Sequence, residues 1–441
     1  MRRAAERPNI LFIITHDTGE HVGCYGAAVE TPNIDRLAGE GVRFENSFCT
    51  APQCSPSRGS VLTGKYPHRN GLVGLAHLGW ELNEGEVTLP MVLGEARYET
   101  YLFGVQHESR DAARLGYAHV RERGASAEGA FAGSGARATE WFLAELPALA
   151  SARKPFFASV GFLETHRPFP HARDGRRAGE VKVPAWLPDR PGIREDIAGL
   201  EGLVREADRC VGRMMDGLEG AGIADRTLVI FTTDHGVAMP RAKGTCYDPG
   251  VKVALIMRPP GSRMRGTPGV RSEMVSNVDI LPTLCEVAGA GRIEGIDGRS
   301  FLALLEGRGY EARKDVFLEM TWHDRYNPMR AVRTERWKYV RNFGERPMVY
   351  LPKDIFLGRA GEEVREEYYA GKRPAEELYD LREDPLERRN VAGEAGCAGV
   401  LAELRGRVEE WMRETGDRLL AGDWPPTEEQ RERDRADATP N

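Results

Sequence analysis

Seven residues near the N-terminus, NILFIIT at positions 9–15, decide the fold of this chain. Residues 10–14 are all apolar, which is typical of a strand buried on both faces of a sheet. The run is too short for a membrane span of about 20 residues or for a secretory signal segment of about 7–15 residues. We therefore expect a buried first strand in a cytoplasmic chain without a membrane partner. Polar His16 and Asp17 follow directly at its carboxyl end.

Similar apolar runs recur and alternate with helical patterns. The further strands are expected at 100–105, 156–162, 228–233 and 253–257. The helices are expected at 33–40, 136–149 and 197–221, the last with apolar residues at helical spacing. Alternating strands and helices predict βαβ units, and hence an α/β fold with a mostly parallel central sheet flanked by helices.

The pattern changes after residue 325. Short strand-like pieces at 330–332, 337–340 and 378–381 do not alternate with helices, and an amphipathic helix is expected at 399–414. We therefore predict a large α/β domain at 1–325 and a smaller C-terminal α+β subdomain, an antiparallel sheet plus a helix, at 326–424. The charged segment 425–441 has almost no large apolar residue, so we expect it to be disordered.

The bulk composition is that of an ordinary soluble globular protein. Of the 441 residues, 41% are hydrophobic and 29% are charged, and the net charge is −6 with acidic and basic residues interleaved. Such a chain offers no basic surface for a polyanion, so we expect no nucleic-acid partner. Its seven cysteines include no CxxC pair, which fits a reducing compartment.

Two polar pairs follow expected strands. His16 and Asp17 come after the first strand, and Asp234 and His235 come after the run at 228–233. The carboxyl ends of parallel strands meet at one edge of the sheet, where open α/β folds place their sites. Two carboxylates and two imidazoles at this edge favour a divalent metal. The alternative is that each aspartate only caps the helix that follows.

Three further candidates share this placement. His107 follows the run at 100–105, His166 follows the run at 156–162, and Lys243 lies a short loop beyond Asp234 and His235. A single histidine or lysine after a strand is commonly a solvated surface group. Their common location at the carboxyl edge instead favours a site that binds an anion and moves a proton.

The stretch CSPSR at 54–58 gives the site its chemistry when it is read with the motifs around it. These motifs are RPNIL at 7–11, TPNIDRLA at 31–38, CSPSRGSVLTG at 54–64, FTTDHG at 231–236 and ELYDLREDP at 377–385. The chain resembles the type I, formylglycine-dependent sulfatases of the alkaline phosphatase superfamily. Looser matches, NGLVGL at 70–75, NPMRAVR at 327–333 and WMRETGD at 411–417, resemble the sulfamidase or heparan N-sulfatase branch.

The resemblance implies an alkaline phosphatase-like fold and hydrolysis of a sulfate ester or N-sulfate of a sulfated carbohydrate, such as an N-sulfoglucosamine unit of a glycosaminoglycan. It implies a formylglycine made from Cys54 by a formylglycine-generating or equivalent maturation enzyme. It also implies one divalent metal, calcium being usual in the family. The implied ligands are Asp17, Asp234 and His235, with His16 as a possible fourth, together with residue 54.

The remaining roles are also implied by the resemblance. Arg58 would steady the nucleophile through its fixed fork of donors. His107 would help to deprotonate the second hydroxyl of the nucleophile when sulfate is expelled. His166 and Lys243 would contact the sulfate and the leaving atom, with His166 as the proton donor and Lys243 as the alternative donor.

Two positions depart from the family pattern. Most sulfatases have two consecutive aspartates after the first strand, whereas this chain has His16 and Asp17. Calcium prefers oxygen ligands and imidazole suits manganese or zinc, so we expect a metal preference shifted away from calcium. Val105 stands where many members carry an anion-binding lysine, so the sulfate pocket loses a positive charge. We also expect His323 to reach over the site toward a sugar carboxylate or sulfate.

Two other functions fit parts of the same pattern. Phosphonate monoester or phosphodiester hydrolases of this superfamily use the same nucleophile and an Asp-His pair like Asp234 and His235. A non-catalytic binding homologue would keep Cys54 unmodified and have a decayed metal site at His16. The joint presence of the nucleophile motif and the metal-binding residues favours the sulfatase.

Overall fold

A computed structural model describes residues 7–122, 133–169, 178–261 and 268–436 of the chain. Its main element is an eight-stranded sheet with the strand order β5-β4-β6-β1-β7-β8-β2-β9. The strands are β1 (Asn9–Thr15), β2 (Val42–Phe44), β4 (Glu99–Gly104), β5 (His119–Glu122), β6 (Phe156–Gly161), β7 (Thr227–Thr233), β8 (Leu255–Arg258) and β9 (Gly269–Arg271). The central strands β4, β6, β1 and β7 are parallel, whereas β8 is antiparallel to both its neighbours. The predicted α/β fold is confirmed.

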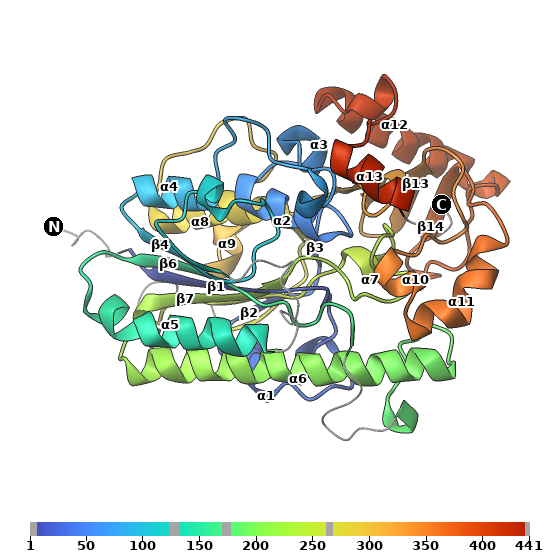
Figure 1. The fold of residues 1–441 in the computed structure, drawn as a ribbon. Helices are drawn as coiled ribbons and strands as arrows, with labels where there is room; N and C mark the ends of the chain where they lie inside the picture. The colour runs from blue at the N-terminus through green and yellow to red at the C-terminus, as the bar shows by residue number, and fades with distance from the viewer. Residues whose placement is uncertain (1–6, 123–132, 170–177, 262–267, 437–441) are drawn as a thin grey trace.

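Helices cover both faces of this sheet (Figure 1). One layer contains α1 (Pro32–Glu40), α5 (Ser134–Ser151) and α6 (Pro191–Gly220), and the other contains α2 (Cys54–Thr63), α4 (Leu89–Glu95) and α8 (Ile280–Ala288). Alternate residues of β1 point to opposite layers: Leu11 and Ile13 pack in one core, while Ile10, Phe12 and Ile14 pack in the other. Because both faces are covered, β1 is apolar throughout, as its sequence predicts.

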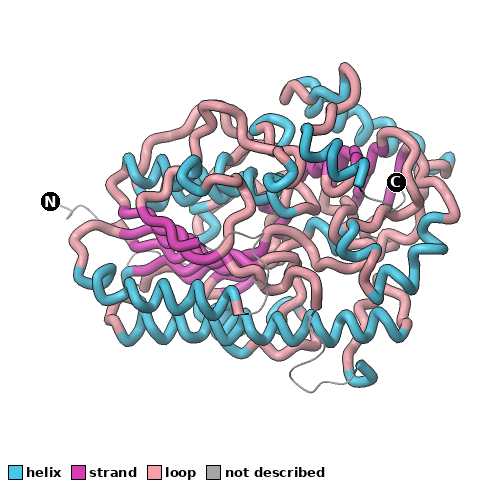
Figure 2. The backbone as a smooth tube through the Cα atoms, in the orientation of Figure 1, coloured by secondary structure: helices cyan, strands magenta, loops and turns pink. Residues whose placement is uncertain are grey.

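A second, antiparallel sheet forms the C-terminal subdomain and lies apart from the large sheet (Figure 2). Its strands, in spatial order, are β11 (Val316–Trp322), β12 (Tyr326–Arg333), β13 (Trp337–Asn342) and β14 (Glu376–Asp380). The helices of this part are α10 (Lys353–Phe356), α11 (Arg359–Tyr369) and α12 (Ala398–Glu414). The sheet begins at Val316 and therefore before the expected boundary at residue 326. The buried polar residues Glu319 and Thr321 interrupt the apolar pattern of β11, which is why this strand was not predicted.

Shorter elements complete the described part of the chain. They are β3 (Ser47–Phe48), β10 (Val275–Ser276), α3 (Pro67–Asn70), α7 (Asp248–Val251) and α9 (Leu302–Leu305). Among the described residues, none of the helices has the length and apolar character needed to cross a membrane.

The expectation of disorder at 425–441 is wrong for most of that segment. Residues 428–436 form the helix α13 (Glu428–Ala436), and Gln430 is fully buried. The order comes from polar contacts rather than from apolar burial: Gln430 Nε2 donates to the Asp324 carbonyl at 3.0 Å, and Arg325 forms an ion pair with Asp434 at 2.8 Å. Composition alone does not reveal such contacts. Residues 437–441 lie outside the described part of the chain.

Candidate active site

The helix α2 explains the spacing of the CSPSR motif. Cys54 is its first residue and Arg58 comes four residues later, so the two side chains lie on one face of the helix. Both are almost fully buried. The Arg58 Nε lies 2.9 Å from the Asp234 Oδ2. The Ser57 hydroxyl donates to the Asp234 carbonyl, and Asn277 Nδ2 donates to the Ser57 Oγ at 2.9 Å. These bonds fix the helix against the end of β7.

Asp17 and Asp234 meet because β1 and β7 pair in register. Thr15 lies opposite Thr233 at the carboxyl ends of the two strands. The Asp17 backbone N–H donates to Asp234 Oδ1 at 2.9 Å. Asp17 adopts a φ of 47°, a left-handed conformation that aspartate tolerates better than most residues and that is often found at functional sites. Both carboxylates are completely buried.

Two imidazoles flank the paired carboxylates. The His235 Nε2 lies 3.0 Å from Asp17 Oδ1, and the His16 Nδ1 lies 3.1 Å from Asp234 Oδ2 and 3.2 Å from Asp17 Oδ1. Burial alone would lower the pKa of His16, but Asp234, Cys54 and Asp17 together outweigh it and raise this pKa to about 9. Burial likewise opposes ionisation of Asp17, but Lys243 and His235 hold its pKa well below the usual value.

This group of residues can hold a metal ion. One ligand atom from each of His16, Asp17, Cys54 and Asp234 lies within 4.8 Å of all the others. The His16 Nε2 is buried without a hydrogen-bond partner. Closely spaced buried carboxylates are stable only when cations accompany them, and carboxylate and imidazole groups are common ligands of manganese and zinc. The residues therefore fit the divalent metal that the resemblance implies.

Lys243 joins the two parts of the molecule at the site. Its buried Nζ lies 2.8 Å from Asp17 Oδ2, 2.9 Å from Asp354 Oδ2 and 3.4 Å from His166 Nε2. Asp354 belongs to α10 of the C-terminal subdomain. Burial would lower the pKa of Lys243, but Asp17 and Asp354 raise it well above the usual value. Asp354 was not predictable from the sequence, because no strand end or motif precedes it.

His107 connects the site to the protein surface. Its ring lies 5.4 Å from that of His16 between centroids, and one ligand atom each from His107, His16 and Cys54 lie within 4.8 Å of one another. The His107 Nε2 is 3.2 Å from the Nδ1 of exposed His77, on which the ring stacks. His77 was also missed, since it follows no strand.

His323 reaches the site from the small sheet. Its Nδ1 lies 2.6 Å from Asp324 Oδ1, and this carboxylate also accepts hydrogen bonds from the Tyr350 hydroxyl and from the Lys353 N–H at 2.9 Å. The ring is buried and interacts with the Cys54 side chain. Burial would lower the pKa of His323, but Asp324 and Cys54 raise it to about 9. The adjacent Asp324 is the feature of the sequence that could have indicated this pairing.

The structure thus brings every predicted site residue to one place. These residues are His16, Asp17, Cys54, Arg58, His107, His166, Asp234, His235, Lys243 and His323.

Comparison with known proteins identifies the family. The sulfatase family model matches residues 8–290, and the model for the C-terminal part of N-sulphoglucosamine sulphohydrolase matches residues 241–352. The first match covers more than half of the chain. The chain belongs to the sulfatase family.

Individual relatives agree with this assignment. This sulfatase is 30% identical to an ulvan-active sulfatase of Formosa agariphila, over 94% of this chain and 82% of the relative. It is 27% identical to the N-sulphoglucosamine sulphohydrolase of Homo sapiens, over 93% of this chain and 90% of the relative. The phosphonate monoester hydrolase of Agrobacterium radiobacter shares the fold, with a TM-score of 0.72 and 23% identity over 94% of this chain and 97% of that one. The predicted family, fold and hydrolase class are confirmed.

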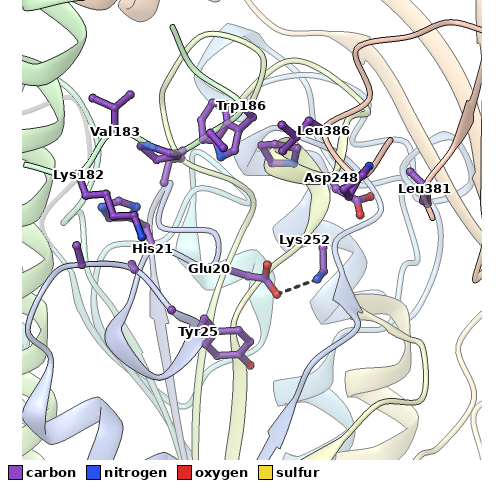
Figure 3. Close-up of a pocket in the computed structure, with 18 of the residues that line it drawn as sticks. Glu20, His21, Tyr25, Lys182, Val183, Trp186, Asp248, Lys252, Leu381 and Leu386 are labelled. Carbon is purple, nitrogen blue, oxygen red and sulfur yellow. Dashed lines mark ion pairs between the residues drawn. The ribbon is translucent and has the colours of Figure 1, made fainter. Parts of the chain in front are cut away.

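A separate cavity of this sulfatase lies near the loops that follow β1 and β7. It has a volume of about 630 Å³ and is lined by Glu20, His21, Tyr25, Trp186, Lys252 and Leu386 among others (Figure 3). Two of the lining residues, Glu20 and Lys252, form an ion pair at 3.4 Å. None of the predicted site residues lines this cavity, so it is distinct from the candidate active site.

Proposed function

We propose that this sulfatase hydrolyses a sulfate ester or an N-sulfate of a sulfated carbohydrate, with residue 54 as the nucleophile after conversion of Cys54 to formylglycine. One observation carries the proposal: Cys54 is buried at the start of α2 beside the paired carboxylates, with its Sγ 3.3 Å from His235 Nε2 and 3.8 Å from Asp17 Oδ1. A thiol attacking sulfate would end as a stable thiosulfate ester. The hydrate of formylglycine instead has one hydroxyl to attack sulfur and a second to expel sulfate.

The metal is proposed to be one divalent ion held by Asp17, Asp234, His235 and His16. When bound, it would lower the pKa of the attacking oxygen and neutralise charge on the sulfuryl group. The position of His16, between both carboxylates, supports a site with imidazole as well as oxygen ligands. We expect manganese or zinc to occupy it in preference to calcium.

The other residues of the site are proposed to donate protons, to accept them or to stabilise charge. An alkoxide or amide ion is a poor leaving group, so the departing sugar atom needs a proton, which His166 or its neighbour Lys243 is placed to donate. His107 is placed to accept the proton of the second hydroxyl as sulfate is expelled. Arg58 keeps Asp234 ionised and oriented toward the metal-binding residues.

The class of sugar rests on the relatives. The names of the two similar enzymes specify ulvan and N-sulphoglucosamine. The match of residues 241–352 to the C-terminal model of N-sulphoglucosamine sulphohydrolase supports an N-sulfated amino sugar in particular.

The test is turnover by protein produced together with a formylglycine-generating enzyme. The substrates are N-sulfoglucosamine, a sugar O-sulfate, 4-nitrophenyl sulfate and a phenyl phosphonate monoester. We expect the sulfated sugars to have the highest kcat/KM and Cys54→Ala to abolish their turnover. Preference for the phosphonate would support the alternative hydrolase. No turnover by fully converted, metal-loaded protein would support the binding homologue.

A further inference from the structure

The C-terminal helix α13 lies across the junction between the two parts of the molecule (Figure 1). The Thr427 hydroxyl, just before the helix, donates to the Leu78 carbonyl, and Glu429 forms a 2.8 Å ion pair with Arg110. On the other side, Gln430 donates to the carbonyl of Asp324 at 3.0 Å. Leu78 follows His77 in the chain and Asp324 follows His323. The helix is therefore held directly beside two histidines of the site.

Arg433 lies on the inward face of this helix. It follows buried Gln430 by three residues, a spacing that places both side chains on one side. Its Nε is buried without a hydrogen-bond partner, and no ion pair involving Arg433 is found within the described ranges. Although His77 is solvent-accessible, partial desolvation of its ring, His107 and the Arg433 guanidinium lower its pKa, which agrees with a guanidinium on the side of α13 that faces His77.

A guanidinium without a carboxylate partner beside a sulfate-binding site is suited to an anion. Arginine presents a planar fork of donors that matches carboxylate and sulfate-like oxyanions in a bidentate manner. The helix that carries Arg433 contacts Leu78 and Asp324, the neighbours of His77 and His323, and His77 lies 3.2 Å from His107. The guanidinium is therefore placed beside these histidines and not beside the nucleophile. This position fits a second anionic group of the substrate better than the sulfate that is hydrolysed.

We propose that α13 is part of the substrate-binding site and that Arg433 binds a second oxyanion, a carboxylate or another sulfate, on the sulfated sugar. The inference rests on the proposed function and deepens it. It makes this sulfatase selective for saccharides with two anionic groups. Val105 leaves the pocket without the lysine that many family members carry. In the proposed site, Arg433 of α13 supplies a positive charge at the edge of the pocket instead.

The experiment measures kcat and KM separately for N-sulfoglucosamine, for N-sulfoglucosamine 6-sulfate and for a sulfated disaccharide with a uronate carboxylate. We expect Arg433→Ala to raise KM for one or both doubly anionic sugars by about ten- to hundredfold, the value of a charge-assisted hydrogen bond. The rise for N-sulfoglucosamine should be much smaller. Arg433→Lys should restore part of the loss. Whichever doubly anionic sugar responds identifies the second group.

Arg431→Ala is the matched control, because Arg431 is an exposed arginine of the same helix. It should leave every KM unchanged, and all variants should keep the wild-type melting temperature. The proposal would be overturned if Arg433→Ala kept the wild-type KM for all three sugars, or if it raised the three KM values by the same factor. Calorimetric binding of N-sulfoglucosamine 6-sulfate separates the two claims: binding that depends on Arg433 without any turnover would refute only the proposed function.

Discussion

At the scale of single residues, the site depends on buried charges that stabilise one another. Asp17 and Asp234 are fully buried carboxylates, and the buried side chains of Arg58 and Lys243 form ion pairs with them at 2.9 and 2.8 Å. Isolated buried charges are strongly unfavourable, so each member of this group depends on the others. Substitutions here should affect both stability and catalysis.

Arg58→Ala tests this dependence. The substitution leaves Asp234 buried without its guanidinium partner, so we expect a loss of about 3–5 kcal/mol in the free energy of unfolding. We also expect kcat/KM to fall by at least about a hundredfold, a change equivalent to roughly 2.7 kcal/mol. Denaturant unfolding and turnover of 4-nitrophenyl sulfate measure the two effects. Arg58→Lys keeps the charge and should lose less stability. Wild-type stability in Arg58→Ala would contradict this account.

His16→Asp tests the metal preference. The substitution restores the carboxylate that most of the family has and gives the site a further oxygen ligand in place of an imidazole. We expect the wild type to retain manganese or zinc, and His16→Asp to shift toward calcium. Metal analysis of protein dialysed against an equimolar mixture of the three ions measures the change. Wild type with calcium at full occupancy would show that His16 does not determine the metal.

At the scale of elements, close packing at the end of β7 holds the site in place. A Cβ on Gly236, which follows His235, would lie only 1.9 Å from the Pro249 carbonyl oxygen. The Pro249 oxygen is a backbone atom and a Cβ is fixed directly to the backbone, so the clash cannot be relieved without shifting the loop that carries Lys243. Glycine is required here for close approach of two chain segments.

Gly236→Ala should therefore destabilise the protein by about 1–3 kcal/mol or more, the usual effect of overpacking, and should reduce metal affinity by displacing His235. The control is Gly39→Ala in α1, where a Cβ meets nothing within 4 Å. That change should stabilise the protein by at most about 0.5–1 kcal/mol, because Gly39 lies in the last turn of α1, where alanine is still favoured over glycine. Thermal unfolding compares the two, and equal effects would refute the steric argument.

A buried charge network anchors the small sheet to His68 of α3. Arg330 of β12 bonds both Asp417 and Glu319, the latter at 3.2 Å, and Glu319 lies 3.0 Å from the His68 Nδ1. Burial alone would raise the pKa of Asp417, but Arg330 outweighs it and holds this pKa below the usual value. Because the pKa of Asp417 is lower in the folded chain, its ion pair stabilises the fold fully at pH values above the unfolded pKa of about 3.9. This stabilisation is lost as the pH falls through the pKa of the folded chain.

Asp417→Asn should lower the free energy of unfolding at pH 7 by about 3 kcal/mol, because Arg330 loses one of its two carboxylates. The difference between wild type and variant should shrink as pH falls below about 4, where Asp417 is protonated in the unfolded chain. Denaturant unfolding at a series of pH values measures it. A difference that stays constant down to low pH would contradict the assigned ion pair.

At the scale of the whole molecule, residues of both the α/β domain and the C-terminal subdomain form the candidate active site. The α/β domain supplies the proposed nucleophile and the proposed metal ligands, while the small subdomain supplies His323 and Asp354, which interact with Cys54 and Lys243. The helix α13 then spans the junction. The subdomain is therefore expected to be needed for activity as well as for stability.

The sequence could predict features that depend on local patterns, but not features that depend on contacts between residues far apart in the chain. The strands β1, β4, β6 and β7 were predictable because apolar runs covered on both faces have a local signature. The residues after them were predictable because parallel strands end at one edge. Asp354 and His77 were not, since only long-range packing brings them to Lys243 and His107.

The most direct test of the central claim is the mass of the peptide that contains residue 54, from protein purified from its native host. The account predicts a peptide in which the CH2–SH group of Cys54 is replaced by an aldehyde, with the corresponding loss of mass, and its hydrate. A peptide that carries only the unmodified thiol, in protein that holds its metal, would contradict the proposed nucleophile.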